Sequence, residues 1–436
     1  MQPLSPLDGR YASRVDALRP FFTEAALNRA RLSVEIQYLL ALGDEKGIPE
    51  LKAFSEREKK AMLAIVEKFS DAENRKVLEI EKTTNHDVKA VEYYLRRQLE
   101  KIGGAKMKTE FVHFALTSED VNNLAYGILV MDALRRVLRP ELQAVISALR
   151  MIAGPNMKRS MLSLTHGQPA TPTTLGKEIM VFVERLERQR DQMVSFRMRG
   201  KFGGAVGNYS AHRAAYPDLN WEAFGRKFMK SLKLEPMTFT TQINPHDDIA
   251  ELSHLYVRTN TILIDLCRDV WSYISRGVFG QSTVKGEVGS STMPHKVNPI
   301  DFENAEGNLG LSSALFDHFA LKLPISRLQR DLTDSTVQRN LGVAFGYHFL
   351  ALASLQKGLR KLSVNREVLS DELHAHPEVM TEAVQTVMRK NGFSDAYERM
   401  KAMSRGKRVT WEELRAFVEK LDIHKDDKKR LLELLS

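Results

Sequence analysis

The sequence is nearly free of cysteine: Cys267 is the one thiol among 436 residues. A single cysteine cannot form a disulfide within the chain, and no Cys-x-x-Cys pair is present to bind zinc. We therefore expect a reducing, cytoplasmic compartment. Cys267 lies in an apolar stretch with helical spacing, which is typical of a small buried hydrophobic residue and not of a catalytic thiol.

Long hydrophobic runs are also absent. No stretch of about 18 apolar residues occurs, so we expect no membrane span. The N-terminal residues do not show a basic segment followed by an apolar one, so no secretory signal is expected. The hydrophobic fraction of 43% and the charged fraction of 27% are typical of a soluble globular protein.

Several cofactor and hydrolase motifs are missing as well. The sequence holds no His-Glu-x-x-His, no Gly-x-x-x-x-Gly-Lys-Ser/Thr and no Gly-x-Ser-x-Gly. The glycines between residues 200 and 207 do not form Gly-x-Gly-x-x-Gly, and no βαβ pattern surrounds them. These absences weigh against zinc, ATP, NAD and serine-hydrolase chemistry, and we expect no metal and no cofactor.

The net charge is positive, at +9. Such an excess attracts anions, which include nucleic acid, membrane surfaces and small polyanionic substrates. The basic residues are spread along the chain, and no basic patch interleaved with aromatic residues is present. Charge alone leaves the kind of partner open, but without such a patch and without a membrane span we expect no nucleic acid and no membrane as partners.

Helical periodicity is what the sequence has in abundance. Residues 247–275 contain neither glycine nor proline, and their apolar residues recur mostly at spacings of three and four. At about 1.5 Å per residue, a helix of this length spans roughly 40 Å and needs partners of similar length. Residues 174–199, 336–362 and 121–153 have the same pattern, the last interrupted at Pro140.

The chain is too long for one ordinary core. We predict an all-α protein of three helical domains, in which the central one is an elongated helix bundle. The predicted domains are residues 1–106, 107–360 and 361–436.

Four polar loops interrupt the predicted helices. In the first, Asn85 or Asp87 is expected to cap a helix whose N-terminus attracts anions. Asn85 and His86 then face a charged ligand, or the segment is a plain cap beside an exposed histidine. In the second, Thr117–Asp120 has the pattern of a capping box. Its hydroxyls also suit a phosphate or carboxylate, although capping alone explains the pattern.

The third loop, Thr165–Pro172, contains a histidine. Thr171 followed by Pro172 predicts a capped helix start with proline at its first position. His166 lies before that start, beside Gly167, where the backbone path is restricted. A histidine held in this way can serve as general acid or base near neutral pH. The alternative is a surface histidine in a rigid turn.

The fourth loop, Gly286–Pro299, is the longest. Its glycines, prolines and hydroxyls suit neither helix nor strand, and long loops in compact domains are often functional. We predict a mobile lid. Ser290 and Ser291 offer hydroxyls, while Lys296 and Asn298 offer donors to a carboxylate.

Residues Gly289–Pro299 resemble the signature of the fumarase/aspartase superfamily, Gly-Ser-Ser-x-Met-Pro-x-Lys-x-Asn-Pro. Within that superfamily, Asn85–Asp87, Thr117–Asp120, Thr165–Pro172 and Arg330–Thr336 are similar to the adenylosuccinate lyase family. The resemblance implies a long helix bundle, a carbon–nitrogen lyase that releases fumarate, and no metal or redox cofactor. It also implies a homotetramer whose sites are each built from three subunits.

The resemblance implies two purine-pathway substrates, adenylosuccinate and succinylaminoimidazole carboxamide ribotide. In the implied β-elimination, Ser290 is the general base, His166 the general acid, and Glu303 the carboxylate that orients the imidazole. The side chains expected to bind substrate are Arg10, Tyr11, Asn85, His86, Asp87, Thr117, Ser118, Gln242, Ser291, Lys296, Asn298, Glu303, Asn304, Arg330, Ser335 and Arg339.

Two alternatives stay open from the sequence. Another fumarate-releasing lyase is the first, although an argininosuccinate lyase favours Gln-Lys-Lys at 295–297 and a fumarase favours glycine at 295. A non-enzymatic structural or nucleic-acid-binding protein is the second, and the presence of His166, Ser290 and Lys296 disfavours it.

Overall fold

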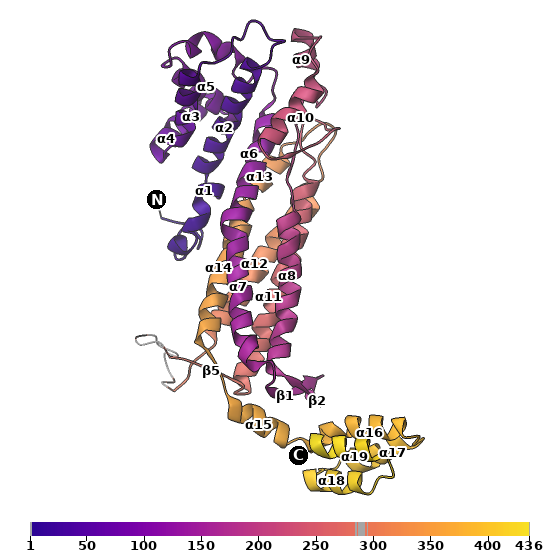
Figure 1. The fold of residues 1–436 in the computed structure, drawn as a ribbon. Coiled ribbons are helices and arrows are strands. Elements are labelled where there is room, and N and C mark those ends of the chain that lie inside the picture. Colours follow the sequence, from indigo (N-terminus) through magenta and orange to yellow (C-terminus); the bar gives the residue numbers. More distant parts are fainter. Residues whose placement is uncertain (1, 284–285, 287–292, 294, 436) are drawn as a thin grey trace. The chain divides into compact units, whose positions relative to one another are not determined.

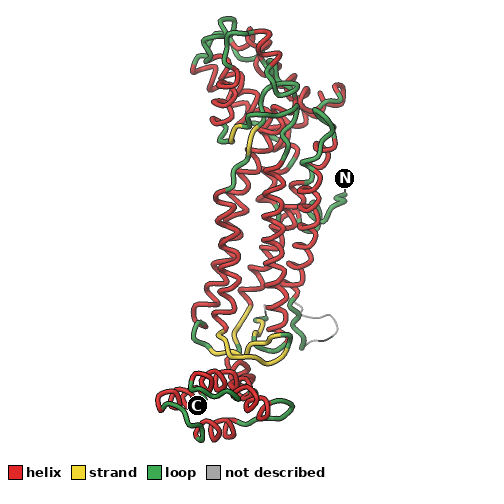
Figure 2. The backbone as a smooth tube through the Cα atoms, turned by 90° about the vertical axis from the view of Figure 1, so that its right-hand side faces the viewer, coloured by secondary structure: helices red, strands yellow, loops and turns green. Residues whose placement is uncertain are grey.

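The computed structural model describes residues 2–283, 286, 293 and 295–435. Helices dominate it, and the described strands form three two-stranded sheets (Figures 1 and 2). Backbone contacts divide the chain into two compact units. The first comprises Met1–Ala144, Glu187–Asp265 and Asn304–Ser354, and the second Val145–Leu186, Leu266–Glu303 and Leu355–Ser436.

Five long helices contribute residues to both units: α7 (Arg139–Ala153), α8 (Leu175–Ser195), α11 (Asp247–Ser275), α12 (Ile300–Lys322) and α14 (Leu341–Lys361). The predicted helix at 247–275 is confirmed to the residue by α11. The three predicted domains stay a prediction, because both units draw on the same long helices. No described helix is long and apolar enough to cross a membrane.

The first unit holds most of the N-terminal helices. Helices α2 (Glu24–Gly43) and α6 (Ser118–Ala133) lie side by side (Figure 1) and bury apolar residues such as Leu32, Ile36 and Leu124. The other helices and strands of this unit are α1 (Arg19–Phe22), α3 (Glu56–Glu67), α4 (Asp71–Thr84), α5 (Asp87–Leu99), β3 (Arg199–Gly200), α9 (Ser210–Ala215), α10 (Trp221–Ser231), β4 (Glu235–Pro236) and α13 (Thr333–Gln338).

The predicted helix at 121–153 is interrupted just before its proline. Helix α6 ends at Ala133, a π-helical turn covers Leu134–Leu138, and α7 begins at Arg139. Pro140 therefore closely follows the π-helical turn, and its missing N–H is accommodated at this irregularity of the helix. The predicted helix at 336–362 is divided between α13 and α14.

The second unit contains a β-hairpin and the C-terminal helices. Strands β1 (Ser160–Thr165) and β2 (Gln168–Thr174) are labelled in Figure 1, and strands are yellow in Figure 2. The other elements of this unit are β5 (Phe279–Gln281), β6 (Leu362–Val364), α15 (Arg366–His374), α16 (Thr381–Lys390), α17 (Ala396–Ser404), α18 (Trp411–Glu419) and α19 (Lys425–Leu434).

The hairpin corrects one prediction. Thr171 and Pro172 do not begin a helix: both lie in β2, and α8 begins at Leu175. Pairing runs from Thr165 opposite Gln168 to Ser160 opposite Thr174, with a register shift that accommodates the extra residue in β2. Proline is tolerated at such a bulge because one ladder hydrogen bond is already missing there.

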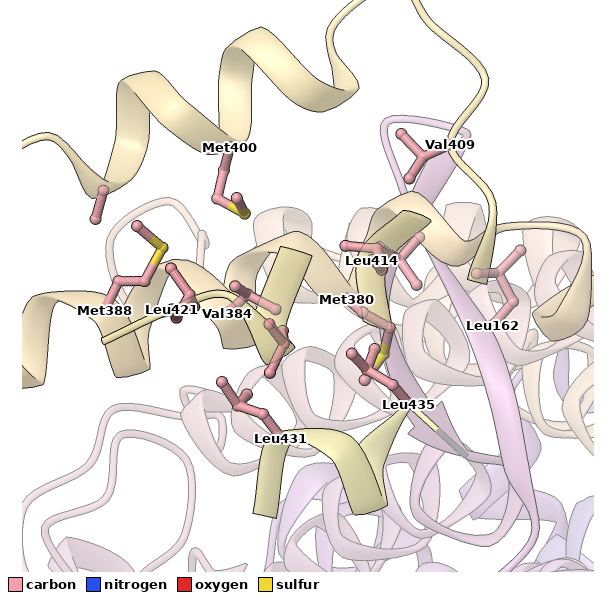
Figure 3. Packing of buried hydrophobic residues seen from close by; sticks show 13 residues of the cluster. Leu162, Met380, Val384, Met388, Met400, Val409, Leu414, Leu421, Leu431 and Leu435 are labelled. Carbon is pink, nitrogen blue, oxygen red and sulfur yellow. The ribbon is translucent and has the colours of Figure 1, made fainter. Parts of the chain in front are cut away.

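A hydrophobic cluster fixes the base of the hairpin. Leu162 of β1 lies among Met380, Leu414 and Leu435 from the C-terminal segment (Figure 3). Burying a leucine side chain contributes on the order of 2 kcal/mol. The hairpin is thus attached to the C-terminal helices through its core face. Cys267 is buried elsewhere in this unit, as predicted.

Candidate active site

His86 and Ser118 come together in the first unit. The Nε2 atom of His86 lies 3.3 Å from Oγ of Ser118, and its Nδ1 atom accepts from the backbone N–H of Lys89 at 3.2 Å. Because Nδ1 accepts, Nε2 carries the ring proton when the imidazole is neutral and donates to the hydroxyl. The first two predicted loops therefore meet at one place.

The predicted cap of α5 was wrong. His86 is the N-cap, and Asn85 is instead the C-cap of α4, with a left-handed φ of 47°. Asparagine tolerates that conformation well, which explains its place between two helices. Asp87 is the first residue inside α5.

Asp87 joins two arginines. Its Oδ2 atom accepts from Arg31 at 2.6 Å and from Arg339 at 2.8 Å, and its Oδ1 atom accepts from the N–H of Val88. Burial by itself raises the pKa of Asp87, but the charge of Arg31, the Val88 N–H and the charge of Arg339 together lower it. Arg339 also donates to Glu24 at 2.7 Å. Its guanidinium is therefore held at two edges.

Gln242 and Arg330 form a second contact between predicted residues. Arg330 donates to Oε1 of Gln242 at 3.5 Å, and the amide of Gln242 donates to the carbonyl of Ala205 at 2.9 Å. Ser335 lies half-buried in α13, close in sequence to Arg330.

The remaining predicted residues of the first unit have separate contacts. The Tyr11 ring centroid is 5.9 Å from the guanidinium of Arg10 and 5.7 Å from that of Arg14. Asn304 lies in α12, where its Oδ1 accepts from Ser354 at 2.7 Å. Within the described part of the first unit, no hydrogen bond or ion pair joins Tyr11 or Asn304 to His86 or Arg339.

His166 occupies the tip of the hairpin in the second unit. With Thr165 paired to Gln168, the turn consists of His166 and Gly167, whose φ values are 54° and 71°. Two successive positive φ values match the turn that best suits the twist of a β-hairpin. The imidazole is exposed. The expectation that this backbone path is unusual is confirmed.

The signature loop is only partly described. Ser290 and Ser291 lie outside the described residues, as does half of the predicted lid. Lys296 is exposed, and Asn298 is half-buried. Glu303 lies in the first turn of α12 and accepts from the indole N–H of Trp271 at 3.2 Å, not from His166. Its predicted role toward the imidazole therefore stays a prediction.

Comparison with known proteins decides the family. Residues 9–311 match the family model described as lyase, and residues 326–436 match that described as adenylosuccinate lyase C-terminal. The chain is 49% identical over 434 residues to the adenylosuccinate lyase of Legionella pneumophila, covering 100% of this chain and 95% of that protein. It is 49% identical over 428 residues to the Escherichia coli adenylosuccinate lyase, covering 98% and 94%. The chain belongs to the adenylosuccinate lyase family.

Solved structures share its fold. A fumarate lyase from Mesorhizobium sp. BNC1 has a TM-score of 0.76 at 18% identity, covering 97% of this chain and 93% of that one. A 3-carboxy-cis,cis-muconate lactonizing enzyme from Pseudomonas putida has a TM-score of 0.75 at 18% identity, covering 98% and 94%. The all-α, fumarase/aspartase-like class predicted from the sequence is confirmed.

Sequence reasoning missed a buried anchor in this adenylosuccinate lyase family member. The carboxylate of Asp120 accepts from the ammonium of Lys201 at 2.7 Å, from the N–H of Thr117 at 2.9 Å, and from the N–H groups of Gly203 and Gly204 at 3.0 Å. The predicted capping residue thus also ties the Thr117 loop to the glycine-rich loop. The glycine cluster was the available signal, since close approach to a backbone favours glycine.

A second group was also missed. Glu119, His246 and Asp334 are buried, and their potential ligand atoms lie within 4.8 Å of one another. However, the amide of Gln338 lies 3.1 Å from Nε2 of His246, the ring nitrogen that lies 3.5 Å from Asp334. Arg330 already places positive charge 3.9 Å from Glu119. These contacts favour a network of opposite charges over a cation site.

Burial dominates the electrostatics of that network. It raises the pKa of Glu119 to about 7, against the lowering effect of His246 and Arg330. Oε1 of Glu119 and both carboxylate oxygens of Asp334 are buried without a hydrogen-bond partner in the described part of the chain. The position of Arg330 is therefore linked to a carboxyl group that titrates near neutral pH.

Proposed function

We propose that this chain eliminates fumarate from adenylosuccinate, giving AMP, and from succinylaminoimidazole carboxamide ribotide, giving the carboxamide. The observation that carries the proposal is the 49% identity, over nearly full length, to proteins named adenylosuccinate lyase. The positive net charge of +9 suits substrates that carry a phosphate and two carboxylates.

An elimination requires a base and an acid, and the assignment of residues to these two roles rests on the family resemblance. A base removes a proton from the carbon beside a carboxylate, the electron pair forms the new double bond, and the carbon–nitrogen bond breaks. An acid then protonates the departing nitrogen. His166 is the proposed acid, and its exposed place at a rigid turn supports that role.

Ser290 is the proposed base. A serine hydroxyl is a poor base in water, so this role requires a closed site and nearby donors that stabilise the alkoxide. Lys296 is the proposed cationic donor. Glu303 is the proposed partner that orients the imidazole of His166.

The proposed binding residues form two groups, one for each end of the substrate. Hydroxyl, amide and ammonium donors are proposed to hold the succinyl carboxylates: Thr117, Ser118, Ser291, Lys296 and Asn298. The nucleotide end is proposed to be held by Arg10, Tyr11, Arg330, Ser335 and Arg339, with Asn85, His86, Asp87, Gln242 and Asn304 completing the pocket. Fixed donors aimed at the carboxylate also stabilise the charge that develops there.

The proposed assembly is a cytoplasmic homotetramer with sites shared between subunits. This proposal rests on the resemblance of Gly289–Pro299 to the superfamily signature.

The deciding experiment is an absorbance assay of the purified protein with adenylosuccinate. We expect the substrate spectrum to convert to that of AMP with release of one fumarate per turnover. His166→Ala should reduce kcat by roughly 100-fold or more. His376→Ala is a control, because that histidine instead contacts Glu378 in the C-terminal segment. Turnover of argininosuccinate but not adenylosuccinate would overturn the proposal.

A further inference from the structure

A basic cavity in the second unit has no role in the proposed reaction. Its volume is about 400 Å³, which lies within the range of small-molecule sites. It is lined by residues from β1, α15, α18 and α19 and from the segment before β1. Its lining includes the cationic side chains Arg159, Arg366 and Arg415, together with His374 and the indole of Trp411.

Two of the arginines are oriented by uncharged partners. Arg159 donates through Nε to Oδ1 of Asn156 at 2.8 Å, and Arg415 donates through Nε to the carbonyl of Leu435 at 2.8 Å. Both contacts fix the guanidinium plane and leave the terminal NH₂ groups available. Among the described residues, none of the three arginines has a carboxylate within 4.0 Å.

Glu412 is an acidic side chain that interacts electrostatically with two residues of the cavity lining, Arg415 and His374. Its own backbone N–H and the hydroxyl of Thr410 lower its pKa first, and the charges of Arg415 and His374 add a smaller effect. Glu412 is fully exposed, so water screens its charge. Guanidinium groups gathered around one cavity repel each other, and a bound anion lowers that electrostatic energy.

The cavity lining also contains aromatic and apolar side chains. The Trp411 indole donates to the carbonyl of His374 at 2.9 Å, and its ring centroid is 5.6 Å from that of His374. Leu369 and Leu373 of α15 line the same cavity, and Ser160 and Ser370 add hydroxyls. An indole face stacks well on a planar heterocycle, whereas arginine binds phosphate through paired hydrogen bonds.

We propose that this cavity binds a phosphomonoester carried on a planar ring, that is, a mononucleotide. This binding is additional to substrate binding at the proposed active site. The phosphate pairs with Arg366 and Arg415, and the base lies against Trp411. A phosphate alone engages only the arginines, and a ribose phosphate leaves the indole uncovered.

The test follows the fluorescence of Trp411 in the full-length protein. The chain has three tryptophans, so the Trp411 signal is the difference between the wild type and Trp411→Phe. AMP is titrated first, then ribose 5-phosphate and inorganic phosphate. We expect AMP to change the Trp411 signal and inorganic phosphate to compete with AMP. Ribose 5-phosphate should bind at least about tenfold more weakly than AMP, because it lacks one stacking contact.

Three variants locate the signal. Arg366→Gln and Arg415→Gln should each weaken AMP binding about tenfold, the effect of one charge-assisted hydrogen bond. Arg389→Gln removes an exposed arginine of α16 that lies outside the cavity, so AMP binding should stay unchanged. Arg366 is itself exposed, so its substitution does not threaten folding.

Two outcomes overturn the proposal: a Trp411 signal that AMP does not change, or one that Arg366→Gln and Arg415→Gln leave intact. If ribose 5-phosphate binds as tightly as AMP, the proposed contact between the base and Trp411 is excluded. Arg330→Gln distinguishes this proposal from the proposed function, because it should impair turnover while leaving the Trp411 signal in place.

Discussion

Asp120 and Lys201 form a 2.7 Å ion pair in which neither side chain has exposed surface. The two residues are 81 positions apart in the sequence. The same carboxylate holds the backbone of Thr117 and of the glycine-rich loop, which in turn contacts Gln242 through Ala205. One buried pair thereby positions two proposed parts of the active site.

Lys201→Met is expected to destabilise the protein strongly. It leaves the carboxylate of Asp120 buried without its cation, which costs on the order of 3–5 kcal/mol. Chemical denaturation measures the loss. Lys82→Met is the matched control, because Lys82 pairs with Glu79 on an exposed helix face and should matter by less than about 1 kcal/mol. Equal losses in the two variants would contradict the proposed anchoring.

Glu119 should make the stability depend on pH in a defined direction. Its folded-state pKa of about 7 lies above its ordinary value of 4.5. The unfolded chain therefore loses this proton before the folded chain does, and the contribution of Glu119 to stability is lost as pH rises between these values. Denaturation of Glu119→Gln across this window should show a weaker decline than the wild type. An exposed substitution, Glu67→Gln, should leave the decline as it is.

Arg339→Lys tests the nucleotide end of the proposed site. The guanidinium contacts both Glu24 and Asp87, a geometry that a lysine ammonium cannot reproduce. We expect KM for adenylosuccinate to rise about tenfold with a smaller change in kcat. Arg327→Lys alters an exposed arginine of the same segment, paired with Asp331, and should leave KM unchanged. If both variants behave alike, Arg339 does not bind substrate.

Mixed oligomers test whether sites are shared. His166→Ala and Ser290→Ala subunits, each inactive alone, should regain part of the activity when they are unfolded together and refolded, because some sites then receive both intact residues. Native mass spectrometry confirms that mixed species form. Mixed species that stay inactive would rule out shared sites.

Helix α11 was predictable because its signal is local. Its apolar residues repeat over 29 residues without glycine or proline, and neighbouring turns of one helix carry the whole pattern. The strand at Pro172 was not predictable in the same way. Threonine followed by proline also begins helices, and only pairing with β1 decides between the two.

The same difference between local patterns and long-range contacts applies to the candidate site. Thr117 and Asp120 were predictable as a cap because Asp120 lies three positions after Thr117. The contact of Asp120 with Lys201 and that of His246 with Asp334 join segments distant in sequence, and one sequence does not encode such pairings in any local pattern. The capping role of His86 was missed because Asn85 and Asp87 are the commoner caps on either side of it.

The turn of the hairpin that carries His166 contains only two residues, His166 and Gly167. Thr165 pairs directly with Gln168, so a single residue inserted between them must either enlarge the turn or slide one strand past the other. A slide of one position would turn Leu162 away from the C-terminal helices and toward water. Natural variation here is therefore expected to change side chains while conserving the number of residues, since it is chain length that keeps the imidazole where it is.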